Sequence, residues 1–270
     1  PKERQNCLPL SADVPQIFTG QTTYAEEGVW LASIPDDLLT RVTAVIGNVD
    51  PSLVSRCTRL EWLQTWSAGT DQYNRPGVFP PGATLTNASG AYGQVVSEHM
   101  FALMWALMKN LPVYGRNQVE HRWHTQERVL TPRGGTALVV GTGDIGSHFA
   151  VLAKATGMHT VGVRRHAARP AQGIDEMHAF TELDALLPHA DVVALVVPSS
   201  PDTHHLIDAR RLALLKREAV VINVGRGDPI EPMALADSSH RGSIWGWGNY
   251  GTELGRRAEQ ALTAGGRRRR

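Results

Sequence analysis

Six residues near the middle of the chain, Gly141-Thr142-Gly143-Asp144-Ile145-Gly146, restrict the fold more than any other segment. They follow the apolar residues 137–140 and open a helix-periodic segment, so we predict a strand, a tight turn and a helix in succession. Gly141 permits the turn, Gly143 lets the main chain approach a diphosphate, and Gly146 lets helix and strand pack closely. Such glycines can also mark a flexible turn, but the strand–turn–helix context favours dinucleotide binding.

The segments after this run alternate between short apolar stretches and helix-periodic ones. Strands that are apolar throughout are buried on both faces, which indicates a parallel sheet covered by helices on each side. We therefore expect a doubly wound α/β sheet. Its predicted strands are 137–140, 159–163, 191–197 and 219–224, and its predicted helices are 145–156, 181–187, 208–217 and 231–239.

The first part of the chain, residues 1–91, has the pattern of a smaller α/β unit. We predict strands over 41–47, 60–66 and 84–86, and a short helix opened by Pro51 with Asp50 as its N-cap. Near Gly93 the period becomes helical, and the following segment is apolar almost all round. Such a helix must be covered on several sides, so we expect it between domains or at a subunit contact.

The residues after the second predicted strand indicate which dinucleotide binds. An acidic residue there would bond the ribose 2′-hydroxyl of NAD, whereas this chain has Arg164 and Arg165. Two guanidinium groups favour the 2′-phosphate of NADP by charge and by bidentate hydrogen bonding. The same residues could instead be two solvated arginines on a loop. NADP is favoured, and NAD stays an alternative.

Composition argues against several other classes of function. The formal net charge is +1, and the run Arg267–Arg270 supplies four positive charges, so we expect no nucleic-acid partner. The most apolar stretch, 95–107, contains Glu98 and His99, so we expect no membrane partner. With two cysteines and no apolar leader segment, we expect a cytoplasmic protein without a disulfide framework or a bound metal.

Four blocks of sequence resemble the D-isomer-specific 2-hydroxyacid dehydrogenases. The resemblance implies a Rossmann doubly wound domain and a smaller flavodoxin-like substrate domain, incomplete at the C-terminus, with the active site between them. It also implies hydride transfer between a nicotinamide cofactor and a small 2-keto or 2-hydroxy acid, and a homodimer. The blocks are 60–71, 85–88 with 97–99, 141–146 and 222–227. The corresponding domains are 1–91 for substrate, 92–246 for NAD(P) and 247–270 as a divergent tail.

The resemblance also implies roles for individual residues. Main-chain groups around Ala68, Gly69 and Thr70 should meet the substrate carboxylate, as exposed amides in a loop can hold an anion. Without the resemblance this segment is equally consistent with a plain turn. Arg226 corresponds to the arginine that binds the carboxylate and polarises the carbonyl. Further cofactor contacts are implied for Thr142, Asp144, Ile145, Pro198, Thr203, Val224 and Gly225, whereas His204 and His205 are expected to be bystanders.

Beyond Gly246 the sequence departs from the family's pattern. The family mechanism uses a histidine that exchanges the hydroxyl proton and a glutamate that holds this histidine. By spacing, Gly255 stands in the place of that glutamate and Tyr250 in that of a usual aspartate, and the family's Thr-Pro-His block is absent from the sequence. A catalytically impaired dinucleotide-binding protein is therefore the alternative to an active dehydrogenase.

Overall fold

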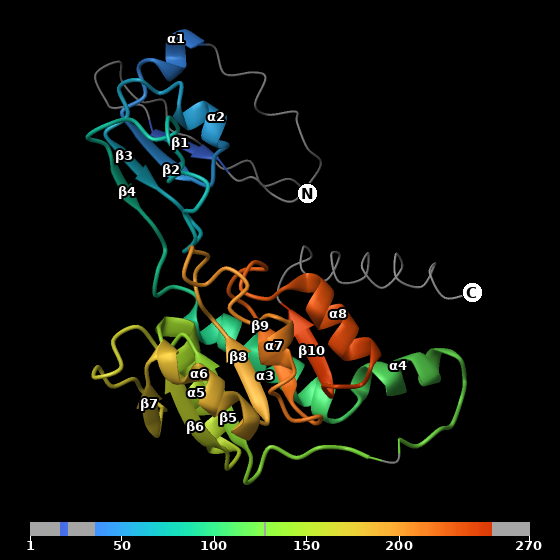
Figure 1. Ribbon diagram of the computed structural model, residues 1–270. Helices are drawn as coiled ribbons and strands as arrows, with labels where there is room; N and C mark the ends of the chain where they lie inside the picture. Colours follow the sequence, from blue (N-terminus) through green and yellow to red (C-terminus); the bar gives the residue numbers. More distant parts are fainter. Residues whose placement is uncertain (1–16, 21–35, 127, 250–270) are drawn as a thin grey trace. The chain divides into compact units, whose positions relative to one another are not determined.

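The computed structural model describes residues 17–20, 36–126 and 128–249. The chain divides into two compact units between Ser89 and Gly90, and each unit has its own parallel sheet (Figure 1). Among the described residues, no helix is both long and apolar enough to cross a membrane. Tyr250 and Gly255 lie outside the described residues.

The smaller unit contains a four-stranded parallel sheet in the order β1-β2-β3-β4. Its strands are β1 (Ile17–Gly20), β2 (Ala44–Gly47), β3 (Trp62–Gln64) and β4 (Thr84–Thr86), and its helices are α1 (Asp36–Leu39) and α2 (Pro51–Val54). The predicted cap of α2 is confirmed, because the Asp50 carboxylate accepts a hydrogen bond from the Ser52 amide at 2.7 Å. Val42, Leu63 and Tyr73 are fully buried at the centre of this unit.

The larger unit contains a six-stranded parallel sheet in the order β10-β9-β8-β5-β6-β7. The chain therefore runs outward from β5 to one edge, returns, and builds the other half of the sheet from β8. This is the predicted doubly wound arrangement, and its order reverses between β5 and β8, where such sheets bind ligands. The strands are β5 (Thr136–Val140), β6 (His159–Val163), β7 (Glu176–His178), β8 (Val192–Leu195), β9 (Val220–Asn223) and β10 (Gly246–Asn249).

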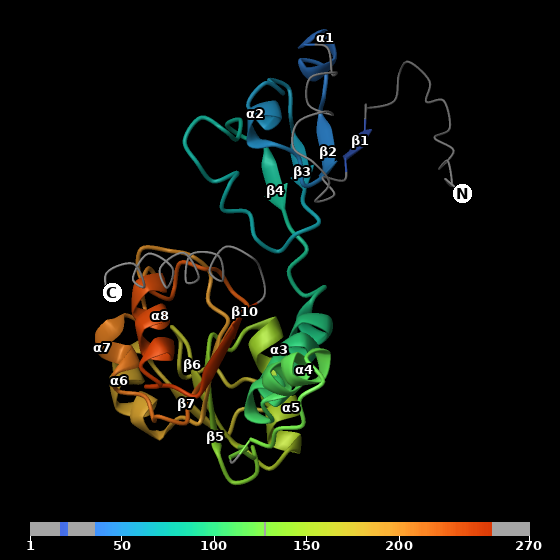
Figure 2. The ribbon, with the colours of Figure 1, turned by 90° about the vertical axis from the view of Figure 1, so that its right-hand side faces the viewer.

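Helices cover both faces of this sheet, as Figure 2 shows. Alternate residues of β5 enter separate cores, with Val139 on the side of α3 and α5 and Leu138 on the side of α6, α7 and α8. Met100 and Met104 of α3 are fully buried against Phe149 of α5. The helices are α3 (Gly93–Met108), α4 (Leu111–Val119), α5 (Asp144–Ala155), α6 (Leu183–Leu186), α7 (Ala209–Leu212) and α8 (Pro232–His240).

One predicted helix is much shorter than expected. We expected a helix over 208–217, but α7 ends at Leu212. Asp208 caps it by accepting from the Arg211 amide at 2.8 Å, and the chain then turns. Lys216, near the end of that turn, pairs with Asp191 at 2.7 Å beside the start of β8. The Ala219 amide then donates to the Lys216 carbonyl at 2.9 Å, and β9 begins at the next residue.

Asp175 connects α5 to β6 and provides a test of the fold. Its carboxylate pairs with Lys154 and accepts hydrogen bonds from the Thr160 amide at 3.0 Å and the Thr160 hydroxyl at 2.8 Å. These contacts, that of Lys154 first, hold the pKa of Asp175 well below its ordinary value. The ionised carboxylate therefore stabilises the folded state above about pH 4, the pKa of an unfolded aspartate, and this contribution is lost as the pH falls toward the folded pKa.

We therefore expect Asp175→Asn to lower the free energy of unfolding by about 1.5 kcal/mol at neutral pH. The difference from the unsubstituted protein should shrink as the pH falls below about 4. Urea denaturation over a series of pH values measures both effects. Asp237→Asn, a change at an exposed residue of α8, serves as the control. A loss for Asp175→Asn that stays constant down to pH 2 would contradict the electrostatic explanation.

Candidate functional site

The glycine run forms the turn between β5 and α5, and two of its glycines are required by packing. Gly141 has φ 101°, and a Cβ atom there would lie 2.5 Å from the carbonyl oxygen of Val196, just after β8. A Cβ atom on Gly146 would overlap the carbonyl oxygen of Gly141 and lie 3.1 Å from Val139 of β5. The two glycines thus let α5 and the chain after β8 approach the turn closely.

The third glycine leaves space for a ligand. Gly143 is the N-cap of α5 with φ −82° and ψ −151°, and a Cβ atom there would meet nothing within 4 Å. No side chain caps the helix, so its first main-chain amides are available to an anion together with the positive end of the helix dipole. These residues fit the diphosphate of a dinucleotide.

Two side chains between these glycines contact neighbouring elements of the larger unit. Thr142 is buried, and its methyl group lies where a Cβ atom on Gly162 of β6 would be. The Asp144 carboxylate lies against Gly93 at the start of α3, and His148 is 3.4 Å from it. The Thr142 and Asp144 side chains thus contact neighbouring strands and helices of the larger unit.

The two arginines after β6 have different environments. Arg164 is half-buried; its amide donates to the His178 carbonyl at 3.1 Å, and its guanidinium donates to the Arg169 carbonyl at 3.5 Å. Arg165 is exposed and pairs with Asp202, in the loop after β8, at 3.5 Å. Both arginines follow the carboxyl end of β6, on the same edge of the sheet as the glycine turn.

The loop after β8 is closed by a buried threonine. Thr203 is 6% exposed; its hydroxyl donates to the Pro198 carbonyl at 2.6 Å and accepts from the Ser200 amide at 2.9 Å. The Thr203 side chain thus holds the loop together, while Pro198 is exposed. Both residues are predicted to contact the cofactor, and the Thr203 hydroxyl also holds the loop in place through its bonds to main-chain groups.

Asn223, at the end of β9, positions the loop that carries Arg226. This asparagine is 1% exposed; its side chain accepts from the Gly225 amide at 3.2 Å and donates to the main-chain carbonyl of Arg226 at 2.6 Å. A Cβ atom on Gly225 would lie 2.5 Å from the Val197 carbonyl, so the two loops touch at that point. The Arg226 side chain is exposed, and its guanidinium donates to the Gly225 carbonyl at 3.0 Å. Val224, at the start of this loop, is buried in the core on the side of α3 and α5.

In the smaller unit, residues 68–70 form a loop after β3 whose carbonyl groups are all occupied. The Ala68 carbonyl accepts from the Asn87 side chain at 2.9 Å, the Gly69 carbonyl from the Ser67 hydroxyl at 2.8 Å, and the Thr70 carbonyl from the Tyr73 amide at 2.9 Å. In a trans peptide the N–H points opposite to the carbonyl. The Gly69 and Thr70 amides therefore point away from these internal partners, as an anion site requires.

A second asparagine, which the sequence analysis did not single out, also supports this loop. The Asn48 side-chain oxygen accepts from the main-chain amides of Trp66 and Ser67 at 3.1 and 3.2 Å. Asn48 follows β2, and Asn87 follows β4. An asparagine at the carboxyl end of a strand is the sequence signal that could have identified Asn48, Asn87 and Asn223 together.

Comparisons with known proteins agree with this geometry. The model of the family "D-isomer specific 2-hydroxyacid dehydrogenase, NAD binding domain" matches residues 101–261. A D-3-phosphoglycerate dehydrogenase of Synechocystis sp. is 29% identical over 201 residues, which are 74% of this chain and 36% of that protein. A D-lactate dehydrogenase of Treponema pallidum is 31% identical over 193 residues, 70% of this chain and 56% of that protein. The chain thus spans 36% to 63% of the length of four curated relatives that it matches.

Solved structures show the same similarity. A D-isomer specific 2-hydroxyacid dehydrogenase family protein of Aeromonas salmonicida has a TM-score of 0.71 and 30% identity, covering 81% of this chain and 71% of that chain. A D-lactate dehydrogenase of Aquifex aeolicus, solved with NAD and lactic acid, shares the fold with a TM-score of 0.73 and 24% identity, covering 86% of this chain and 76% of that one.

Proposed function

Because the chain belongs to the D-isomer specific 2-hydroxyacid dehydrogenase family, we propose that it transfers a hydride between a nicotinamide dinucleotide and a small 2-keto or 2-hydroxy acid. One observation carries this proposal. The uncapped N-terminus of α5, behind Gly143, follows β5, and Arg226 follows β9. Because β5 and β9 are parallel strands of one sheet, both groups lie at the same carboxyl edge. In this proposal the helix N-terminus binds the cofactor diphosphate and the Arg226 guanidinium binds the substrate, both at the edge where such sheets bind ligands.

Each group has a distinct part in the proposed reaction. The nicotinamide supplies or accepts the hydride. The main-chain amides of 144–146 hold the diphosphate. The Arg226 guanidinium binds the substrate carboxylate and stabilises the negative charge that develops on the carbonyl oxygen. In the smaller unit, the amides of Gly69 and Thr70, with the adjoining Ala68, offer donors to a substrate carboxylate, and the occupied carbonyls of this loop support that role.

Cofactor oxidation tests the proposal. We expect the protein to consume NADPH or NADH with at least one of glyoxylate, hydroxypyruvate, pyruvate and phenylpyruvate. In reverse, where the hydroxy acid is chiral, we expect it to oxidise the D but not the L isomer. Loss of nicotinamide absorbance measures turnover, and quenching of tryptophan fluorescence measures cofactor binding separately. Saturable cofactor binding without turnover on any of these acids would contradict the proposed activity while preserving the nucleotide site.

We further propose that the cofactor is NADP, because Arg164 and Arg165 follow β6 where a 2′-phosphate would lie. Replacing both arginines by alanine should weaken NADPH binding about 30-fold and change NADH binding less than about threefold. Asp202→Asn removes the partner of Arg165 and should strengthen NADPH binding, by no more than about fivefold because that ion pair is exposed. Equal losses for NADPH and NADH in the double variant would contradict the assignment.

We also propose that the protein is a cytoplasmic homodimer. Large apolar side chains are exposed on and after α3 and α4, with Val95 67%, Val119 80% and Trp123 97% exposed. A second copy of the chain would cover them, as the family resemblance suggests. The free, buried thiol of Cys57 agrees with a reducing compartment. Light scattering should give twice the mass of one chain, and a monomer at micromolar concentration would contradict the dimer.

A further inference from the structure

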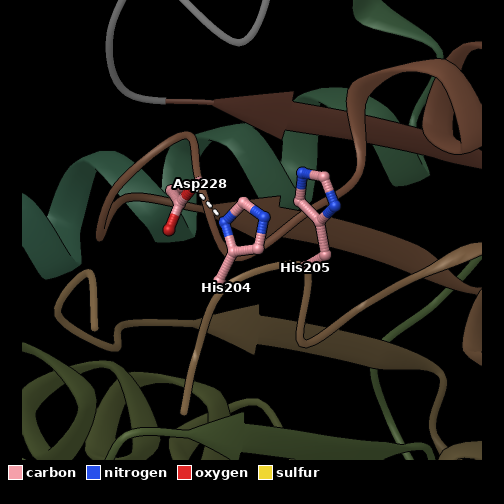
Figure 3. Close-up of side chains that lie close together, drawn as sticks. All are labelled: His204, His205 and Asp228. Atoms are coloured by element: carbon pink, nitrogen blue, oxygen red, sulfur yellow. Dashed lines mark hydrogen bonds and ion pairs between the residues drawn. The ribbon is translucent and has the colours of Figure 1, made fainter. Parts of the chain in front are cut away.

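Two histidines and an aspartate meet beside the candidate active site, at the carboxyl edge of the larger sheet (Figure 3). His204 and His205 end the loop after β8, and Asp228 lies in the loop after β9, two residues beyond Arg226. Each of the three side chains offers a nitrogen or oxygen atom within 4.8 Å of those of the other two. Among the residues that the structure describes, this is the group of histidine, cysteine and carboxylate side chains whose spacing suits a metal ion.

The aspartate of this cluster is fixed by its neighbours. One carboxylate oxygen of Asp228 lies 2.6 Å from Nδ1 of His204, and the other accepts a hydrogen bond from the Ser199 hydroxyl at 3.0 Å. Its main-chain carbonyl accepts from the His205 amide at 3.0 Å. A hydroxyl that donates to a ligating carboxylate orients that ligand in protein metal sites, and Ser199 supplies such a bond here.

The two imidazole rings lie against each other. Their rings stack with centroids 3.9 Å apart at an interplanar angle of 20°. His205 has φ 45°, a left-handed conformation that is costly for residues other than glycine, and its amide bond to Asp228 helps to hold it there. The backbone therefore keeps both imidazoles beside the Asp228 carboxylate.

The charge of the cluster also suits a cation. The Asp228 side chain supplies carboxylate oxygens, and two imidazole rings lie beside it. The imidazoles are neutral ligands when deprotonated, so a divalent ion would find one negative charge and two nitrogen donors.

We propose that His204, His205 and Asp228 bind a divalent transition-metal ion of the Zn²⁺ class. Imidazole nitrogens with one carboxylate suit zinc, cobalt and nickel better than magnesium or calcium, which prefer oxygen ligands. Two ligand atoms on one zinc ion lie about 3.4 Å apart, so the ion would replace the 2.6 Å hydrogen bond between His204 and Asp228 and draw the more distant donor atoms closer. Rotation of the exposed imidazoles allows both changes. The ion joins the loop after β8 to the loop after β9, and its fourth position stays open to water or to a small anion.

Binding of Zn²⁺ to chelator-treated protein tests this proposal without any turnover measurement, so its outcome is independent of the proposed dehydrogenase activity. Isothermal titration should show one ion per chain, and a hundredfold excess over the Kd should raise the Tm by about 5 °C. His204→Ala and Asp228→Asn should each weaken binding at least about tenfold, because each removes one of three ligands. His205→Asn should do the same, and asparagine tolerates the left-handed backbone at that position.

A histidine at the other end of β8 provides the matched control. His189 is exposed in the turn that precedes β8, and His189→Ala should leave zinc binding unchanged. Co²⁺ offers a readout on the unsubstituted protein, since coordination by nitrogen and carboxylate ligands should produce visible absorption bands that Zn²⁺ abolishes. Equal zinc affinity in His204→Ala and the unsubstituted protein, or an absence of cobalt bands, would overturn the proposal.

Discussion

Replacing Gly143 by valine should weaken binding of NADPH and NADH about 100-fold while leaving the Tm nearly unchanged. The backbone there, with φ −82° and ψ −151°, is one that any residue adopts, and a Cβ atom meets no protein atom within 4 Å. The folded protein therefore accommodates the side chain. The valine methyl groups instead occupy the space in front of the α5 amides, where the diphosphate binds in our proposal. Tryptophan fluorescence titration measures the loss, which corresponds to about 2.7 kcal/mol.

Gly146→Ala is the matched comparison, because it adds a smaller group in the same turn. A Cβ atom there would overlap the carbonyl oxygen of Gly141, so α5 and β5 must separate. We expect this variant to lose about 2 kcal/mol of stability as well as cofactor affinity. If Gly143→Val kept full affinity, the diphosphate would not lie over this helix N-terminus. If Gly143→Val destabilised the protein as much as Gly146→Ala, the space in front of Gly143 would not be open.

The larger sheet was predictable because its central strands are apolar on both faces and its key turn carries three glycines. β6 was predicted to the residue, and all four residues of β8 and of β9 are buried. These features depend on local sequence, since a strand buried on both sides has no polar alternation to obscure it.

The edges of the sheet were not predicted, because distant residues decide them. β10 contains Gly246 and Gly248, which disfavour a strand when read locally. In the structure, Cβ atoms on these glycines would lie 3.2 and 3.3 Å from Leu107 and Leu103 of α3, so the glycines let that helix pack against the edge strand. β7 consists of Glu176, Met177 and His178, too short and polar to show a period.

The candidate site shows the same division. The glycine turn and Arg226 lie just after β5 and β9, the two strands from whose ends the sequence predicted their positions. The sequence analysis missed the residues that position a loop through hydrogen bonds. Their partners are main-chain atoms or residues far away in the sequence, and neither shows in a local pattern. Asn223 acts through the main chain of the next loop, and Asn48 acts through a segment 18 residues later. His204 and Asp228, 24 residues apart, become neighbours only when two loops are placed side by side.

Replacing Arg226 by alanine should lower kcat/KM for the 2-keto acid about 1000-fold and change the Kd for NADPH less than about twofold. The loop should survive this change, because Asn223 holds it through the main-chain carbonyl of Arg226, which alanine retains. The loss therefore comes from the guanidinium alone, which binds the carboxylate and stabilises charge on the carbonyl oxygen in our proposal. Steady-state kinetics and fluorescence titration measure the two quantities.

Arg226→Lys distinguishes a bidentate guanidinium from a simple positive charge. Lysine keeps the charge but cannot form two parallel hydrogen bonds, so it should recover no more than about a tenth of the lost activity. Added guanidinium ion should partly restore the alanine variant, because a small cation can occupy the vacated space, whereas an arginine that only supported the loop would show no such rescue. Full activity in Arg226→Lys, or a parallel loss of NADPH binding in Arg226→Ala, would show that this side chain does not act on the substrate.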